Sequence, residues 1–131
     1  MFTSLIIFST TDGHTKKICE RISKFLDNEK PTKIVSLNEA TKLNLSEFQR
    51  IIIGASIRYG KHSKELYKFI ELNKKILDQN PNVFFSVNVV ARKFEKNTPE
   101  TNPYIKKFLE VSKWQPKKLG VFAGKVDYPN Y

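Results

Sequence analysis

The chain opens with a run of apolar positions that leads straight into a loop of small and hydroxyl-bearing residues. Residues 4–8 are rich in strand formers, and residues 9–15 contain three threonines and one glycine. Apolar positions with helical spacing begin soon afterwards, at Ile18, Ile22, Phe25 and Leu26. The pattern predicts a strand, a tight loop and a helix, in that order.

The same alternation continues along the rest of the chain. Four more apolar runs of strand length lie at residues 33–37, 51–55, 83–90 and 119–123. The run at 51–55 is apolar on both faces, which is typical of a central strand in a parallel sheet. Residues 38–47 form a polar connection with about one helical turn.

Two further helices are predicted between these strands. Ser63 is the expected N-cap of the first. Asn102 followed by Pro103 begins the second, because proline at the first helical position loses no needed hydrogen bond. Their buried faces are expected to consist of Leu66, Phe69, Ile70 and Leu77 in the first helix, and of Ile105, Phe108 and Leu109 in the second.

Strands and helices that alternate in this way predict an α/β fold with a parallel sheet covered by helices on both faces. The 131 residues are enough for one domain, residues 1–131, with one core. Apolar residues make up 40% of the chain and include 10 phenylalanines, which excludes a disordered protein.

The loop at residues 9–15 has the chemistry of a phosphate site. Backbone N–H groups at a helix N-terminus are unpaired and carry the positive end of the helix dipole, so they stabilise an anion without a lysine. Thr10, Thr11 and Thr15 add hydroxyl donors, and Gly13 permits close approach or a positive φ. An ordinary helix cap would use the same residue types. The glycine-rich fingerprints of dinucleotide and nucleoside triphosphate sites are absent from the sequence.

Ligands of open parallel sheets bind beyond the carboxyl ends of the strands, where the strand order reverses. The loops after the first, third and fourth strands, at residues 9–15, 56–62 and 88–101, are therefore expected to meet there. The second loop places Ile57 and Tyr59 where a planar ring could lie, although it also fits an ordinary surface loop.

The third loop carries Asn88 and Arg92, which can hydrogen-bond ring carbonyls or offset developing negative charge. A phosphate cradle beside an apolar, aromatic-edged slot favours flavin mononucleotide, FMN, bound as in flavodoxins. The expected fold is therefore flavodoxin-like, with a five-stranded parallel sheet in the order 2-1-3-4-5.

The chain is strongly basic, with a formal net charge of +10 carried mainly by scattered lysines. Solvated surface lysines are the simplest interpretation. The positive electrostatic field of these lysines would also attract an anionic lipid surface, an acidic partner or a carboxylate-bearing substrate. A basic patch alone is a weak signal for nucleic acid, and no nucleic-acid partner is expected.

The cysteine and the histidines predict no catalytic thiol and no metal site. Cys19 lies on the apolar face of the first helix, where a cysteine is usually core filler, and one cysteine cannot form an internal disulfide. His14 and His62 stand alone without metal-ligand spacing, and His62 is expected to be solvated. The absence of a signal peptide and of a membrane-spanning run predicts a cytoplasmic protein.

Three motifs give the sequence a recognisable resemblance. They are Phe-Ser-Thr-Thr-Asp-Gly-His-Thr at residues 8–15, Ile-Gly-Ala-Ser-Ile-Arg-Tyr-Gly at residues 53–60 and Ser-Val-Asn-Val-Val-Ala-Arg-Lys at residues 86–93. With them the chain resembles, from end to end, the flavodoxin-like, quinone-dependent protoporphyrinogen oxidases of bacterial haem biosynthesis. Many flavodoxin relatives share the first motif, whereas the second and third are more specific to this family.

The resemblance implies an enzyme that uses FMN to oxidise protoporphyrinogen IX to protoporphyrin IX. The electrons would pass to a membrane quinone, menaquinone or ubiquinone, from a cytoplasmic protein that is peripheral on the anionic inner membrane. No acid–base residue is assigned. Arg58 and Arg92 are candidates for contact with the substrate propionates or the reduced flavin, because guanidinium binds carboxylate in a bidentate fork.

The resemblance also assigns the cofactor-binding residues. Those expected to hold the FMN phosphate are Ser9, Thr10, Thr11, Asp12, Gly13, His14 and Thr15. Those expected to border the isoalloxazine ring are Ser56, Ile57, Arg58, Tyr59, Gly60, Ser86, Val87, Asn88, Val89, Val90, Ala91 and Arg92.

Members of this family normally continue past a Tyr-Pro segment, here Tyr128-Pro129, through a loop and a final helix that covers the sheet beside the first helix. This last helix is expected to be missing, because the sequence ends at Tyr131. Without it, about 400–500 Å² of apolar surface on the sheet would be exposed, a loss of folding free energy on the order of 10 kcal/mol. A monomer is therefore expected to need another covering surface, such as a second copy in a homo-oligomer.

Two alternatives stay open from the sequence. A flavodoxin-type electron carrier would share the fold and FMN but have no substrate of its own, and such carriers are typically acidic. A shortened, inactive relative of the oxidase would keep the motifs without the activity. A phospho-receiver regulator is disfavoured, because it needs acidic residues where this chain has Ser9 and Gly54.

Overall fold

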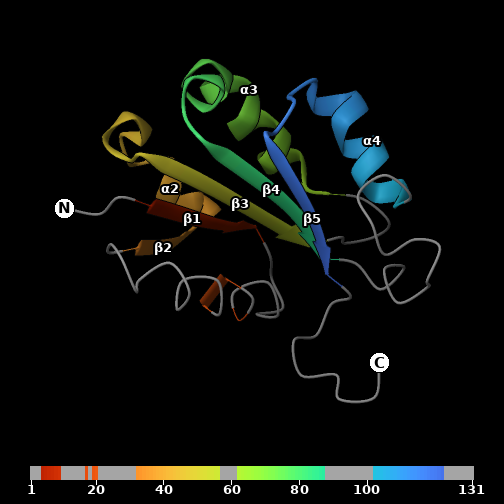
Figure 1. Ribbon diagram of the computed structural model, residues 1–131, viewed down its shortest axis with the longest axis horizontal. Helices are drawn as coiled ribbons and strands as arrows, with labels where there is room; N and C mark the ends of the chain where they lie inside the picture. Colours follow the sequence, from red (N-terminus) through yellow and green to blue (C-terminus); the bar gives the residue numbers. More distant parts are fainter. Residues whose placement is uncertain are drawn as a thin grey trace.

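The computed structural model of the protein describes residues 4–9, 17, 19–20, 32–56, 62–87 and 102–122. Its strands form a five-stranded parallel sheet in the order β2-β1-β3-β4-β5 (Figure 1). The strands are β1 (Ser4–Ser9), β2 (Thr32–Ser36), β3 (Arg50–Ser56), β4 (Asn82–Val87) and β5 (Lys118–Phe122). The predicted number, direction and order of the strands are confirmed.

The described helices are α2 (Leu37–Ala40), the 3-10 helix η1 (Leu45–Glu47), α3 (Lys64–Gln79) and α4 (Pro103–Ser112). The predicted caps are confirmed, because the Ser63 side chain accepts from the Leu66 N–H and Asn102 accepts from two N–H groups of α4. The predicted polar connection holds two short helical segments rather than one. Ser36 caps α2 in a capping box, which ends β2 one residue before the predicted strand end.

One face of the sheet packs against α2, α3 and α4. Alternate strand residues such as Leu5, Ile53 and Phe84 contact the predicted apolar stripes of these helices in one continuous core. Figure 1 shows α3 and α4 along the same side of the sheet. The helix stripes are therefore confirmed, with Leu109 only partly buried.

The opposite face of the sheet carries a second apolar cluster. Ile6, Ile52, Phe85 and Val87 pack there with Cys19, whose side chain is fully buried. Burial raises the pKa of the Cys19 thiol to about 12, so the thiol stays protonated at neutral pH. The prediction that Cys19 is a core residue rather than a nucleophile agrees with this environment.

Gly54 in β3 lets the side chain of Phe85 in β4 lie close to the backbone on this second face. It pairs with Phe85 across β3 and β4. A Cβ atom built on Gly54 would lie 2.0 Å from the Phe85 Cζ atom, so the phenyl ring lies directly over the glycine. Phe85 is only 2% exposed in this position. The ring thus fills the space that a side chain at residue 54 would occupy.

Candidate functional site

The carboxyl ends of the central strands meet at one edge of the sheet, as predicted. Ser9 at the end of β1 pairs with Ala55, and Ser56 at the end of β3 pairs with Val87 at the end of β4. The three candidate loops therefore start side by side. Of the predicted site residues, the structure describes Ser9, Ser56, Ser86 and Val87. The others, at residues 10–15, 57–60 and 88–92, lie outside the described residues.

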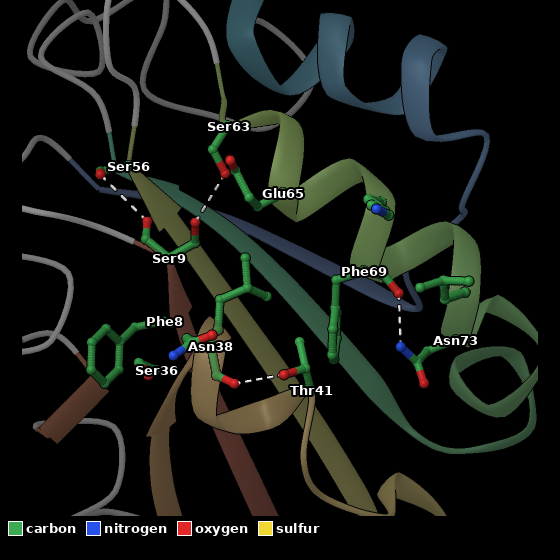
Figure 2. Close-up of a pocket in the computed structure, with 13 residues that line it drawn as sticks. Phe8, Ser9, Ser36, Asn38, Thr41, Ser56, Ser63, Glu65, Phe69 and Asn73 are labelled. Carbon is green, nitrogen blue, oxygen red and sulfur yellow. Dashed lines mark hydrogen bonds between the residues drawn. The ribbon is translucent and has the colours of Figure 1, made fainter.

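Ser9 links two of these loop starts. Its carbonyl oxygen accepts a hydrogen bond from the Ser56 hydroxyl at 3.5 Å, and its own hydroxyl lies 3.3 Å from the Ser63 hydroxyl (Figure 2). Ser63 in turn caps α3. The described part of the edge thus presents small, hydroxyl-bearing side chains. This donor set fits a ligand with a phosphate and a flat ring, because it offers hydrogen bonds without bulk.

His62 is the largest departure from the sequence prediction. It was expected to be solvated, but it is only 3% exposed, and its Nε2 atom lies 3.0 Å from the Ser86 hydroxyl. Ser86 is itself fully buried near the end of β4. The bond joins the last residue of one candidate loop to the strand that precedes another.

Two phenyl rings pack against the His62 ring. Phe84 and Phe108 meet it edge-on, with ring centroids 5.7 and 5.4 Å away. These two phenyl rings stack on each other at 3.8 Å, and Trp114 packs edge-on against both. Burial lowers the pKa of His62 from 6.5 to about 4. His62 is therefore neutral at physiological pH, and it can act as a fixed hydrogen-bonding group.

A cleft of about 760 Å³ opens beside Ser9, between α2 and α3. Figure 2 shows Phe69 and Asn73 on α3 facing Asn38 and Thr41 across it. This volume is within the range of small-molecule sites. Of the cleft residues, only Ser9 and Ser56 were among the predicted site residues. The sequence signal that could have indicated this cleft is Leu72, an apolar residue of α3 that lies outside the buried stripe and is 75% exposed.

Two features are absent from the described residues, a cluster of metal-ligating side chains and a membrane-spanning helix. Over those ranges, no three His, Cys, Asp or Glu side chains gather in a group that could hold a metal ion. In the same part of the chain, no helix has both the length and the apolar character needed to cross a membrane.

Comparison with known proteins identifies close sequence relatives. A protoporphyrinogen IX dehydrogenase [quinone] from Leishmania major is 41% identical over 129 residues, which cover 97% of this chain but 56% of that protein. The protein of the same name from Escherichia coli (strain K12) is 38% identical over 129 residues, covering 98% of this chain and 71% of that protein. The chain thus spans little more than half the length of the first relative.

The fold comparison agrees with the sequence comparison. The structure matches oxidised Flavodoxin 2 from Bacillus cereus with a TM-score of 0.59 and 13% identity, over 95% of this chain and 86% of that one. It also matches a flavodoxin from the domain Archaea, with a TM-score of 0.56 and 16% identity over 91% and 82% of the two chains. The family model for the flavodoxin domain matches residues 5–131. The chain therefore belongs to the flavodoxin domain family and, within it, to the family of the quinone-dependent protoporphyrinogen IX dehydrogenases.

Proposed function

We propose that the protein binds FMN at the carboxyl edge of its sheet, oxidises protoporphyrinogen IX and passes the electrons to a quinone. The observation that carries this proposal is the 38% identity to the Escherichia coli dehydrogenase over 98% of the chain. The motifs at residues 8–15, 53–60 and 86–93 lie within the matched region.

The proposed cofactor site is made of residues 9–15 for the phosphate, and of residues 56–60 and 86–92 for the isoalloxazine ring. Support comes from the strand register, which brings Ser9, Ser56 and Val87 to one edge. FMN, when bound, supplies an acceptor for the electrons of the substrate. Hydroxyl and backbone N–H groups of the first loop bind the phosphate, and the other two loops orient the ring.

His62 and Ser86 have a positioning role in this proposal. Their 3.0 Å hydrogen bond joins the last residue of the loop at residues 56–62 to β4, two residues before the loop at residues 88–101 begins. Because the imidazole is buried and neutral, it adds no charge beside the ring. Its contribution is to hold the end of one ring-binding loop and the start of the other at a fixed separation.

Peripheral contact with an anionic membrane is also part of the proposal. The net charge of +10 supports it, because a basic protein is attracted to anionic lipid, where a lipid-soluble quinone is found.

The proposal is tested by an anaerobic titration of the FMN-loaded protein. Protoporphyrinogen IX is expected to bleach the visible flavin absorbance, and a quinone added afterwards is expected to restore it. Dithionite serves as the control, because it reduces any accessible flavin. Bleaching by dithionite but not by the porphyrinogen would contradict the proposed activity and would favour an electron carrier.

Replacing Arg58 or Arg92 by alanine is expected to lower kcat/KM for the porphyrinogen by about 10- to 100-fold, the effect of losing a charge-assisted hydrogen bond. Steady-state kinetics at saturating quinone measure the change. Arg50→Ala is the matched control, since Arg50 bonds to Ser4 at the opposite, amino end of the sheet. Unaltered kinetics in both variants would exclude the two arginines from substrate binding.

A further inference from the structure

The cleft between α2 and α3 extends from the carboxyl edge of the sheet along α3. Its lining includes Ser9 and Ser63 at the carboxyl edge of the sheet, and Phe69 and Leu72 farther along α3. Leu72 is nine residues beyond Ser63, which corresponds to about 13 Å along a helix. The cleft thus joins the proposed flavin edge to the outer surface of the molecule.

The end of the cleft at Ser9 is suited to a hydrogen-bond acceptor. The hydroxyls of Ser9 and Ser63 share one hydrogen bond of 3.3 Å, which uses one of their two protons. When Ser9 donates this bond, the proton of Ser63 can be donated to a ligand oxygen. The Asn38 side chain, which also lines the cleft, adds an amide group. A neutral carbonyl group would find donors here.

The part of the cleft lined by Phe69 and Leu72 of α3 is apolar. Phe69 is buried, and Leu72 is 75% exposed. A large apolar side chain at this exposure gains free energy when a hydrocarbon chain covers it. The apolar end therefore suits an aliphatic tail that leaves the cleft over Leu72.

The charges of the cleft favour a neutral ligand. Its described lining carries one acidic and one basic side chain, Glu65 and Lys68. A porphyrinogen would bring two propionates, which one lysine cannot pair and which Glu65 would repel. A quinone carries no charge and meets neither difficulty.

We propose that this cleft binds the prenylated quinone, with a ring carbonyl at the Ser63 hydroxyl and the tail leaving past Leu72. The assignment rests on the proposed function, because it names the site of the electron acceptor. The bound quinone accepts two electrons and two protons, which the reduced cofactor gives up on reoxidation, and it leaves as the quinol.

Binding is tested by NMR on the FMN-loaded protein with labelled leucine methyl groups. The probe is 2-methyl-3-prenyl-1,4-naphthoquinone, and the expected result is a saturable shift of the Leu37 and Leu72 signals. The methyl groups of Leu5 and Leu77, which are fully buried in the core, are the internal reference. Saturable binding that leaves Leu37 and Leu72 unshifted would overturn the assignment. Shifts of the same signals by the porphyrinogen would overturn it as well.

A pair of surface variants tests the role of the tail. Leu72→Asn is expected to raise KM for the prenylated quinone about fivefold, the effect of about one lost methylene contact. KM for the tail-less 2-methyl-1,4-naphthoquinone is expected to change less than about twofold. Val111→Asn is the matched control, because Val111 is a large apolar residue of α4 that is also exposed, at 47%, and does not line the cleft.

Reduction of the flavin by the porphyrinogen tests the proposed function, and its reoxidation by the quinone tests the cleft assignment. Bleaching by the porphyrinogen is expected to be equally fast in the wild type and in both variants. Normal bleaching with the same quinone KM in Leu72→Asn and Val111→Asn would contradict the cleft assignment alone. Failure of the porphyrinogen to bleach the wild type would contradict the proposed function, and the methyl shifts would still decide whether the quinone occupies the cleft.

Discussion

Replacing Gly54 by alanine is expected to destabilise the protein by about 1–3 kcal/mol, a typical effect of overpacking a filled core. The added methyl group would lie 2.0 Å from the Phe85 Cζ atom, so the phenyl ring would have to leave its place on the sheet. The free energy of unfolding from denaturant titrations measures the change. Gly120→Ala is the control, because a Cβ there would be 3.4 Å from Phe85, at ordinary contact distance.

A double-mutant cycle with Phe85 tests whether the phenyl ring is the cause of this destabilisation. Phe85→Ala alone is expected to destabilise by about 3–5 kcal/mol, the usual effect of deleting a buried phenyl ring. In that background, Gly54→Ala is expected to be neutral or stabilising, since it fills part of the space that the ring has left. Equal tolerance of alanine at Gly54 and Gly120 in the wild-type background would show that the ring does not lie over Gly54.

Lowering the pH from above 6.5 to about 4 is expected to destabilise the protein through His62 by up to about 3 kcal/mol. The folded state keeps His62 neutral down to about pH 4, whereas the unfolded chain binds a proton near pH 6.5. Between these values the unfolded state holds more protons, so acid favours unfolding. The stabilising contribution is complete above pH 6.5 and is lost as the pH falls toward 4.

The measurement is the free energy of unfolding as a function of pH for the wild type and His62→Gln. Glutamine can still bond to Ser86 but does not titrate in this range, so the pH slope between 4 and 6.5 is expected to become shallower. Ser86→Ala is expected to lower stability while keeping the slope, because the buried imidazole remains. Equal slopes in the wild type and His62→Gln would mean that His62 is not held neutral by burial.

The sheet and the main helices could be predicted because local patterns and global topology agree. The run at residues 51–55 is apolar on both faces, and the structure places it in the middle of the sheet as β3. Ser63 and Asn102 combine a capping side chain with an apolar stripe immediately afterwards, and both begin helices. These signals depend on neighbouring residues only.

His62 and the cleft could not be predicted in the same way. The burial of His62 depends on Phe84 and Phe108, which are 22 and 46 residues away in the sequence and meet it only in the folded sheet–helix layer. The cleft likewise needs the short α2 and the long α3 to lie on one face with space between them. Spacing along the chain carries no information about such gaps.

The starting points of the cofactor loops were predictable, because parallel strands place their carboxyl ends at one edge. Ser9 and Ser56 meet there as expected. The detailed assignments within residues 10–15, 57–60 and 88–92 remain predictions that rest on the resemblance to the family.

The central claim is that the edge formed by Ser9 and its neighbours binds FMN through its phosphate. The most direct measurement is a titration of the purified, folded protein with FMN and, separately, with riboflavin, which has the same ring but no phosphate. The account predicts a coloured complex with about one FMN per chain and much weaker binding of riboflavin. Protein that stays colourless after incubation with excess FMN and removal of the unbound flavin, or that binds both flavins equally, would contradict it.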